Sequence, residues 1–235
     1  MEDLFMTYMT ERFVKDLKTE SGSLNKSAGP LVTISREYGC PSKKMVELLY
    51  GKIKNQYGTA VCPWKVVNKE ILNEAAQKIG LDPARMAYVF KDVEKTLMDE
   101  VVESMTTRYY VSDRRIKKAI VEVIKQIAQQ GHVILVGRGG VAVTSNMANS
   151  LHLRLFASVD WRTHELMERK GFSEKEARAQ ITDLDAKRWK LIHEFGLPNA
   201  NDHTFDLLLN CEKLSIEQMS DTILSLMRAK GLIVP

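Results

Sequence analysis

Short apolar runs alternate along this chain with longer stretches in which apolar side chains recur every three or four residues. The runs predict buried strands at 31–34, 66–67, 132–136, 151–156 and 205–209. The helical spacing predicts helices around 45–53, 69–79, 116–127, 160–169, 174–192 and 215–230, and a charged helical stretch at 83–108. Such alternation is typical of parallel β-α-β units. We therefore expect a three-layer α/β fold with a parallel sheet of about five strands and helices on both faces.

The chain begins with a separate amphipathic segment. Residues 3–18 carry an apolar stripe at helical spacing, and a linker of small residues follows at 21–30. We therefore divide the chain into an N-terminal helical appendage with its linker, 1–30, and a domain at 31–235. The stripe must be buried somewhere, and a homodimer contact is one way to bury it.

Composition narrows the class of protein. Hydrophobic residues make up 44% of the chain, and 34 basic against 30 acidic residues give a net charge of +4. That charge is too mild to indicate a nucleic-acid partner. No apolar run approaches the roughly 20 residues of a membrane-spanning helix, and the N-terminus lacks the order of a signal peptide. Cys40, Cys62 and Cys211 lie far apart, so we expect reduced thiols in a cytoplasmic protein and no metal site.

In sheets of this kind ligands bind beyond the carboxyl ends of the strands, so the loops after strands carry the candidate chemistry. The first of them, SREYGCPSKK at 35–44, lies where a phosphate-binding loop would lie. The residues it offers are Gly39, Ser42, Lys43 and Lys44. It does not spell GxxxxGK[ST], and Pro41 has no amide hydrogen to offer a phosphate. An ordinary strand-to-helix turn with two solvated lysines is the alternative.

The loop after the third predicted strand has two interpretations. From Gly137 to Ala142 it fits the dinucleotide-binding pattern G-x-G-x-x-[GA], and Asp160 lies near the place of a ribose-binding acid. The helix after this pattern would be short and rich in β-branched residues, so an NAD-binding oxidoreductase is a remote alternative. Arg138, in the same loop, either holds a phosphate with its planar fork or forms a structural ion pair.

Charged residues of both signs are dense after the fourth predicted strand. Most of them form a solvated helix face. Arg162 directly follows the strand, and Asp185 and Arg188 lie three residues apart on one helix face. Phosphoryl transfer depends on positioning and on neutralising developing charge, which converging arginines supply. His164 and His193 lack any constellation of metal ligands.

Six stretches, in this order, resemble the cytidylate kinase-like family, a branch beside the bacterial CMP kinases. They are VTISREYG (32–39), WKVVNKEIL (64–72), HVILVGRGG (132–140), LHLRLFASVDWRTHELMERKGFSEKEA (151–177), DAKRW (185–189) and FDLLLNCEKLSIEQ (205–218). The resemblance implies a P-loop kinase fold with a helical part that binds the nucleoside monophosphate and a lid at about 160–195. It implies a cytoplasmic kinase that uses ATP with Mg²⁺ to phosphorylate a nucleoside monophosphate such as CMP or dCMP. Nucleotides are then the expected partners, with neither nucleic acid nor membrane.

The resemblance also implies roles for individual residues. It places the loop at 35–44 at the donor phosphates, with Ser35, Gly39, Ser42, Lys43 and Lys44 as binding residues. It places Arg138 at the acceptor phosphate, Arg162 and Arg188 at the lid and the transferred phosphoryl group, and Asp185 near the acceptor ribose or Arg188. Lys43, Arg162 and Arg188 are the candidate catalytic residues.

The chain departs from the CMP kinases at several of these positions. Ser42 stands where the phosphate lysine belongs, with Lys43 one place later, and Pro41 and Arg36 replace glycines. Gly139 stands where CMP kinases carry an acid that helps to select cytosine. A misplaced charge and a missing amide affect the transition state most. The second hypothesis is therefore a catalytically impaired nucleotide-binding or regulatory module on the same fold.

Overall fold

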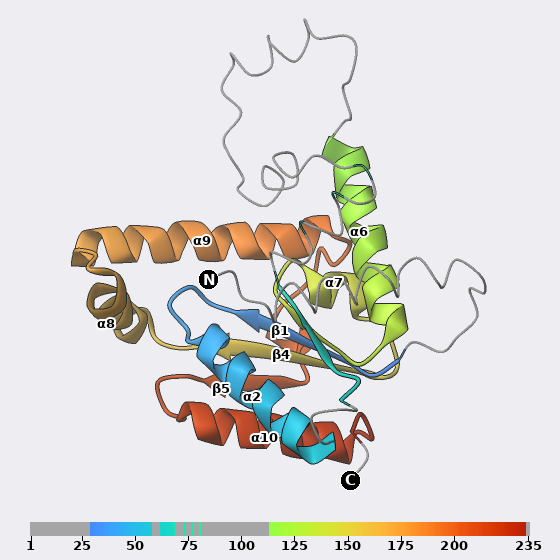
Figure 1. Ribbon diagram of the computed structural model, residues 1–235. Helices are drawn as coiled ribbons and strands as arrows, with labels where there is room; N and C mark the ends of the chain where they lie inside the picture. The colour runs from blue at the N-terminus through green and yellow to red at the C-terminus, as the bar shows by residue number, and fades with distance from the viewer. Residues whose placement is uncertain are drawn as a thin grey trace, which may run out of the picture.

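Five parallel strands form one sheet in the order β2-β3-β1-β4-β5 (Figure 1). The computed structural model describes residues 29–57, 62–68 and 113–233 and the single positions 73, 77 and 80. The strands are β1 (Leu31–Arg36), β2 (Lys65–Val67), β3 (Val133–Val136), β4 (Ser150–Phe156) and β5 (Leu207–Asn210). The α/β fold and the five-stranded parallel sheet that the sequence predicts are confirmed. β5 begins later than predicted because the 3-10 helix η1 (Asp202–Thr204) ends at Phe205.

Helices cover both faces of the sheet (Figure 1). On one face α2 (Ser42–Tyr57) and α10 (Ile216–Ala229) pack against each other. On the other face lie α6 (Asp113–Gln130), α7 (Gly140–Thr144) and α9 (Glu174–Glu194). The sheet is thus the middle of three layers.

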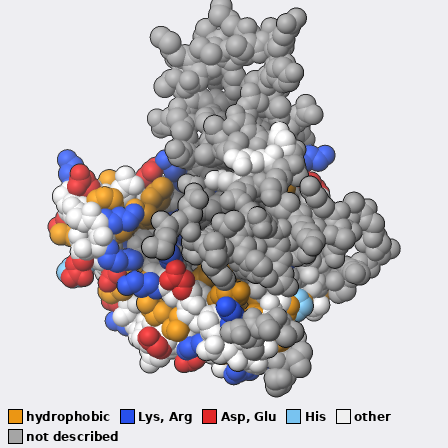
Figure 2. All heavy atoms as spheres, viewed as in Figure 1, with side chains coloured by type: hydrophobic (Ala, Val, Ile, Leu, Met, Phe, Trp, Pro, Cys, Tyr) orange, Lys and Arg blue, Asp and Glu red, His pale blue; other side chains and the backbone are white. Residues whose placement is uncertain are grey.

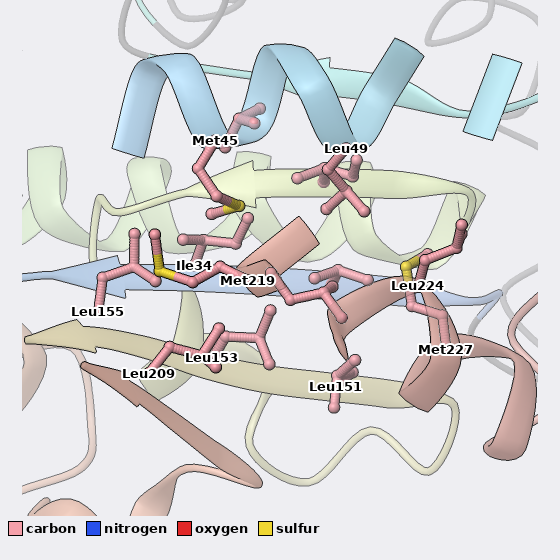
Figure 3. Close-up of a cluster of buried hydrophobic side chains, with 14 of the residues drawn as sticks. Ile34, Met45, Leu49, Leu151, Leu153, Leu155, Leu209, Met219, Leu224 and Met227 are labelled. Carbon is pink, nitrogen blue, oxygen red and sulfur yellow. The ribbon is translucent and has the colours of Figure 1, made fainter. Parts of the chain in front are cut away.

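The strands are mostly apolar because both faces of the sheet are covered by helices. On β1, Leu31 belongs to the cluster under α6, whereas Ile34 belongs to the cluster under α2 and α10. Figure 3 shows this second cluster, in which Ile34 lies with Met45 of α2 and Met219 of α10. Burial of each such side chain stabilises the fold by about 1.5–3 kcal/mol. The predicted apolar stripes therefore form the two halves of the core.

A helical hairpin follows β4 at the carboxyl edge of the sheet. Its first helix, α8 (Val159–Lys170), begins where the Ser158 side chain accepts a hydrogen bond from the amide of Trp161 and ends at Gly171, whose φ is 69°. Ser173 and Glu176 form a capping box that starts α9. The short connection makes α8 and α9 neighbours. Leu166, Ala177 and Ile181 are packed between them, and Tyr38 from the loop after β1 joins this cluster.

Several predicted segments lie outside the described residues. They are the helix at 3–18, most of the linker at 21–30, the charged stretch at 83–108 and almost all of the helix at 69–79. Among the helices that are described, none combines the length and the apolar character needed to span a membrane.

Candidate functional site

A pocket opens at the carboxyl ends of β1 and β3, beneath α9. Its lining combines four arginines and two carboxylates with an apolar wall. The lining residues are Ser35, Arg36, Glu37, Gly137, Arg138, Gly139, Arg154, Asp185, Arg188, Trp189, Leu191, Ile192 and Phe205. The structure therefore brings together Ser35, Arg138, Asp185 and Arg188 from the predicted site residues.

The loop between β1 and α2 uses most of its backbone amides within the protein. The Glu37 amide donates to the carbonyl of Leu155 at 3.0 Å, and the Tyr38 amide donates to Oδ1 of Asp185 at 2.7 Å. The Cys40 amide donates to the carbonyl of Glu37 at 3.3 Å, and the Ser42 amide to that of Cys40 at 2.9 Å. Pro41 has no amide hydrogen. In this arrangement the loop has few amides left to hold a phosphate.

The two lysines of the loop point away from the pocket. Lys43 has a side chain that is 91% exposed, and its Nζ lies 3.9 Å from Oε1 of Glu47 one turn later. An exposed pair of this kind contributes little to stability. Lys44 is exposed as well, and neither lysine lines the pocket.

Gly39 makes room for α8. Its φ is 100°, and a Cβ at this position would lie 2.9 Å from the Cβ of Arg162. Any other residue would force the loop and α8 apart. Arg169, near the end of α8, also donates a hydrogen bond to the Gly39 carbonyl. The structure thus gives Gly39 a role in packing the loop against α8.

Arg162 is buried behind the pocket and makes four polar contacts. Its Nε donates to the carbonyl of Ala157 at 3.1 Å and its Nη1 to that of Tyr38 at 3.1 Å. Nη1 also lies 2.5 Å from Oδ2 of Asp185, and Nη2 lies 3.3 Å from Oε2 of Glu37. Only 5% of its side chain is exposed. Arg162 therefore holds together the loop, the end of β4 and α9, and is not among the lining residues.

Arg188 connects α9 to the end of β1. Its Nη1 donates to the carbonyl of Arg36 at 2.9 Å and lies 3.6 Å from Oδ1 of Asp185. Its guanidinium also lies over the ring of Tyr38, at 5.6 Å. Burial lowers the pKa of Arg188, although the charge of Asp185 opposes this effect. Asp185 thus pairs with both Arg162 and Arg188 and joins them to the loop.

Arg36 and Arg138 form the floor of the pocket. The guanidinium of Arg36 rests on Gly137, where a Cβ would come within 1.8 Å of Nη1. Burial, followed by the positive charges of Arg188 and Arg138, lowers the pKa of Arg36 to about 9. Arg138 has a φ of 58°, a conformation that residues other than glycine rarely adopt. Such strained residues gather at functional sites.

Arg154 forms one wall of the pocket. It is paired with Glu37 at 2.8 Å and with Asp202 at 3.0 Å. Its guanidinium carbon lies 4.4 Å from the centre of the Trp189 ring and 5.9 Å from that of Phe205. A planar guanidinium stacks well on such rings. The sequence analysis does not include Arg154 among the site residues. An arginine inside an otherwise apolar strand is the sequence signal that could have indicated it.

The turn after β3 does not have the form of a dinucleotide-binding motif. The helix that follows, α7, is only five residues long. Gly139 has a φ of 65°, and a Cβ there would lie 2.7 Å from Cδ2 of Phe195. Phe195 therefore fills the space into which a larger residue at 139 would extend. The geometry offers no support to the NAD-binding alternative.

The remaining charged and metal-binding candidates lie on the surface. Figure 2 shows basic and acidic side chains interspersed over the part of the described surface that it displays. His164 is exposed and pairs with Glu168 on its own helix at 3.1 Å, and His193 lies against Trp189 with ring centres 6.0 Å apart. Within the described ranges, no three His, Cys, Asp or Glu side chains are grouped so that they could hold a metal ion.

Comparison with known proteins identifies relatives over most of the chain. Residues 31–213 match the cytidylate kinase-like family. A cytidylate kinase of Sulfolobus acidocaldarius is 27% identical over 160 residues, which are 67% of this chain and 86% of that protein. An uncharacterized protein from Eubacterium ventriosum, known from its crystal structure, has a TM-score of 0.57 at 20% identity, over 87% of this chain and 99% of that chain. A shikimate kinase from Bacteroides thetaiotaomicron has a TM-score of 0.46 at 11% identity, over 85% of this chain and 98% of that chain.

Proposed function

The chain belongs to the cytidylate kinase-like family, and we propose that it is a kinase that transfers a phosphoryl group from ATP to a nucleoside monophosphate. One observation carries the proposal. Arg36, Arg138, Arg154 and Arg188 gather around a single pocket at the carboxyl edge of a parallel sheet. This edge is where α/β folds bind their ligands.

The charges of the pocket suit a phosphate. Four guanidinium groups line it against two carboxylates, those of Glu37 and Asp185. Like charges held this close repel one another unless an anion compensates them. Phosphoryl transfer needs such a surplus of positive charge, because charge develops on the transferred group as it passes between oxygens.

The arginines take different roles in this proposal. Arg138 binds the phosphate of the acceptor, and Arg188, on α9, contacts the transferred phosphoryl group. Arg162 is buried and saturated with protein contacts, so we propose it as a positioning residue in place of the catalytic role that the resemblance implies. Asp185 joins these groups and aligns Arg188.

The acceptor base lies against the apolar wall of the pocket, which includes Trp189 and Phe205. CMP and dCMP are the first candidates, since the relative from Sulfolobus acidocaldarius bears the name of a cytidylate kinase. The acid that helps CMP kinases to select cytosine has no counterpart at Gly139, and Phe195 fills the adjacent space. Selection of the base therefore rests on other residues of this wall.

The loop at 35–44 is the proposed site of the ATP phosphates. ATP binding requires that Asp185 release the Tyr38 amide and that α9 move away from the loop. Lys43 and Lys44 are mobile enough, as exposed side chains, to reach over the donor phosphates, beside the hydroxyls of Ser35 and Ser42.

Mg²⁺ enters as a complex with ATP. Glu37 and Asp185 are both in ion pairs with arginines, so the described residues do not form a site for the ion by themselves. Mg²⁺ commonly keeps several waters and binds through substrate phosphates.

A coupled assay of ADP formation tests the proposal. It is run with ATP, Mg²⁺ and each nucleoside monophosphate in turn. We expect turnover with at least one acceptor, and a loss of about a hundredfold in Arg138→Met. Arg178→Met is the control, because Arg178 lies on α9 but pairs with Asp160 and Glu174 at the surface. No turnover with any acceptor, at high enzyme concentration, would exclude the kinase.

The loop at 35–44 favours a second candidate function, a module that binds a nucleotide but transfers no phosphoryl group. Lys43 is 91% exposed, and the Tyr38 amide is already bonded to Asp185. Isothermal titration calorimetry separates the two candidates. The module binds a nucleotide but yields no product, whereas product formation excludes it.

A further inference from the structure

The first glycine position of the phosphate loop is occupied by Arg36, at the end of β1. A P-loop holds phosphate with backbone amides and with a lysine. Here the amides of Glu37, Tyr38, Cys40 and Ser42 are bonded within the protein. The lysine nearest to the expected place, Lys43, points into solvent. Binding of a phosphate therefore depends on other groups.

Arg36 is held in place by shape and not by an opposite charge. No carboxylate in the described part of the chain forms an ion pair with its guanidinium, and Arg188 donates instead to its backbone carbonyl. Nη1 of the guanidinium lies against Gly137, where even a methyl group would collide with it. The positive charges of Arg138 and Arg188 are its close neighbours. A half-buried charge without a counter-charge costs free energy that an anionic ligand can offset.

We propose that Arg36 is the principal phosphate-binding residue of the pocket, and that with Arg138 it holds the phosphate monoester of the acceptor. This inference rests on the proposed function, because it takes the ligand to be a nucleoside monophosphate.

The chemistry of the ligand follows from the lining. A phosphate monoester carries nearly two negative charges at neutral pH. It accepts paired hydrogen bonds from planar guanidinium groups. Next to the arginines lie Trp189 and Leu191, so the group attached to the phosphate has an apolar or aromatic face. Free phosphate and ribose 5-phosphate should therefore bind through the same arginines, but more weakly than a complete nucleotide.

The test is calorimetry of the wild type and three variants with CMP, AMP and inorganic phosphate, together with thermal melting without ligand. Arg36→Met should weaken binding of each phosphate compound about tenfold or more. Its melting temperature should not fall, because the variant removes a charge whose close neighbours are the like charges of Arg138 and Arg188 and with which no carboxylate of the described residues pairs. Arg178→Met, the matched control, replaces an arginine of α9 that pairs with Asp160 and Glu174 at the surface, and it should bind like the wild type. Arg36→Lys keeps the positive charge but lacks the planar guanidinium, so its affinity for the phosphate compounds should lie between those of Arg36→Met and the wild type.

Each outcome decides the question. If Arg36→Met binds the monophosphates as tightly as the wild type, or if it unfolds, the inference is wrong while the proposed function stands. If the wild type binds inorganic phosphate but no nucleotide, the proposed function fails. In that case Arg36 remains a phosphate-binding residue if its replacement abolishes phosphate binding. If the wild type binds none of the three compounds, both are overturned.

Discussion

Oδ1 of Asp185 accepts a hydrogen bond from the backbone amide of Tyr38 at 2.7 Å, although 147 positions separate the two residues in the chain. A carboxylate of α9 thus binds an amide of the loop at 35–44, the proposed site of the ATP phosphates. Oδ2 of the same carboxylate is 2.5 Å from Nη1 of Arg162. The ring of Tyr38 packs beside Leu166 and Ile181 of the helical hairpin. Asp185 therefore fastens the proposed lid to the loop.

Replacing Asp185 with Asn should destabilise the fold. The amide oxygen of Asn can still accept the Tyr38 hydrogen bond, but the buried Arg162 loses one of its two carboxylates. Removing one partner of a buried ion pair leaves an uncompensated charge, so we expect a loss of about 3 kcal/mol in the free energy of unfolding. Urea denaturation followed by circular dichroism measures it. Asp183→Asn is the control, since Asp183 pairs with Lys187 at the surface and should change stability by under about 0.5 kcal/mol. Equal losses of unfolding free energy in the two variants would contradict a stabilising role for the ion pair between Asp185 and Arg162.

Replacing Gly139 with Ala should cost more than the same change at Gly171. Both glycines have a positive φ, 65° and 69°, so each alanine carries backbone strain of about 1–2 kcal/mol. At Gly171 nothing lies within 4 Å of the added Cβ, whereas at Gly139 the Cβ lies 2.7 Å from Cδ2 of Phe195. Phe195 is buried, and displacing it adds about 1–3 kcal/mol. Urea denaturation of the two variants compares them. A smaller loss at 139 than at 171 would mean that Phe195 moves freely.

Local signals in the sequence were enough to predict most of the fold. Met45, Leu49 and Ile53 recur at helical spacing, and all three are buried on α2. The start of α9 depends on residues 173–176 alone, because the side chains of Ser173 and Glu176 each accept a hydrogen bond from the other's backbone amide. Signals of this kind act within one or two turns of helix, so they can be recognised without knowing the tertiary structure.

The site was predicted less completely because its contacts are long-range. The strand ends correctly pointed to Arg138 and Arg162 as residues near the carboxyl edge of the sheet. The sequence did not indicate that Arg162 would be buried against Tyr38, 124 positions away, because this depends on how the helical hairpin docks on the loop. Arg36 and Arg154 were overlooked for a different reason. Arg36 stands in the predicted loop as the replacement of a glycine, and Arg154 lies inside a predicted buried strand, so neither position by itself indicates a residue of the pocket.

Chemical labelling should report on the loop through Cys40. Cys40 is buried beside Cys211, and a hydrogen bond with Cys211, followed by burial, raises the pKa of its thiol. Only the thiolate reacts quickly with iodoacetamide. We therefore expect the half-buried Cys62 to be labelled first and Cys40 to stay protected until the protein opens. Mass spectrometry of peptides over time measures both rates. Asp185→Asn, which loosens the loop, should speed the labelling of Cys40 but not that of Cys62. Rapid labelling of Cys40 in the wild type would show that the loop is not held as described.

His152 should make the fold sensitive to mild acid. It is buried on β4, where its ring nitrogens lie 2.8 Å from Oγ1 of Thr33 and 3.0 Å from Oγ of Ser150. Burial lowers its pKa, against an opposing effect of Asp206 and with a smaller contribution from the charge of Lys230. The unfolded chain takes up a proton near pH 6.5, whereas the folded chain resists protonation to a lower pH. Stability is therefore complete above about pH 6.5 and declines as the pH falls below it.

The decline can be measured as the free energy of unfolding in urea between pH 7.5 and pH 5. Each such histidine can contribute at most about 1.4 kcal/mol per pH unit. His152→Gln should be less stable than the wild type at pH 7.5, because Gln cannot replace both hydrogen bonds, but its stability should fall less steeply with pH. A remaining slope is expected from His132, whose pKa is also lowered by burial. His164→Gln is the control, since His164 is 70% exposed, and it should leave the slope unchanged. If His152→Gln declines as steeply as the wild type, protonation of His152 is not what destabilises the folded protein.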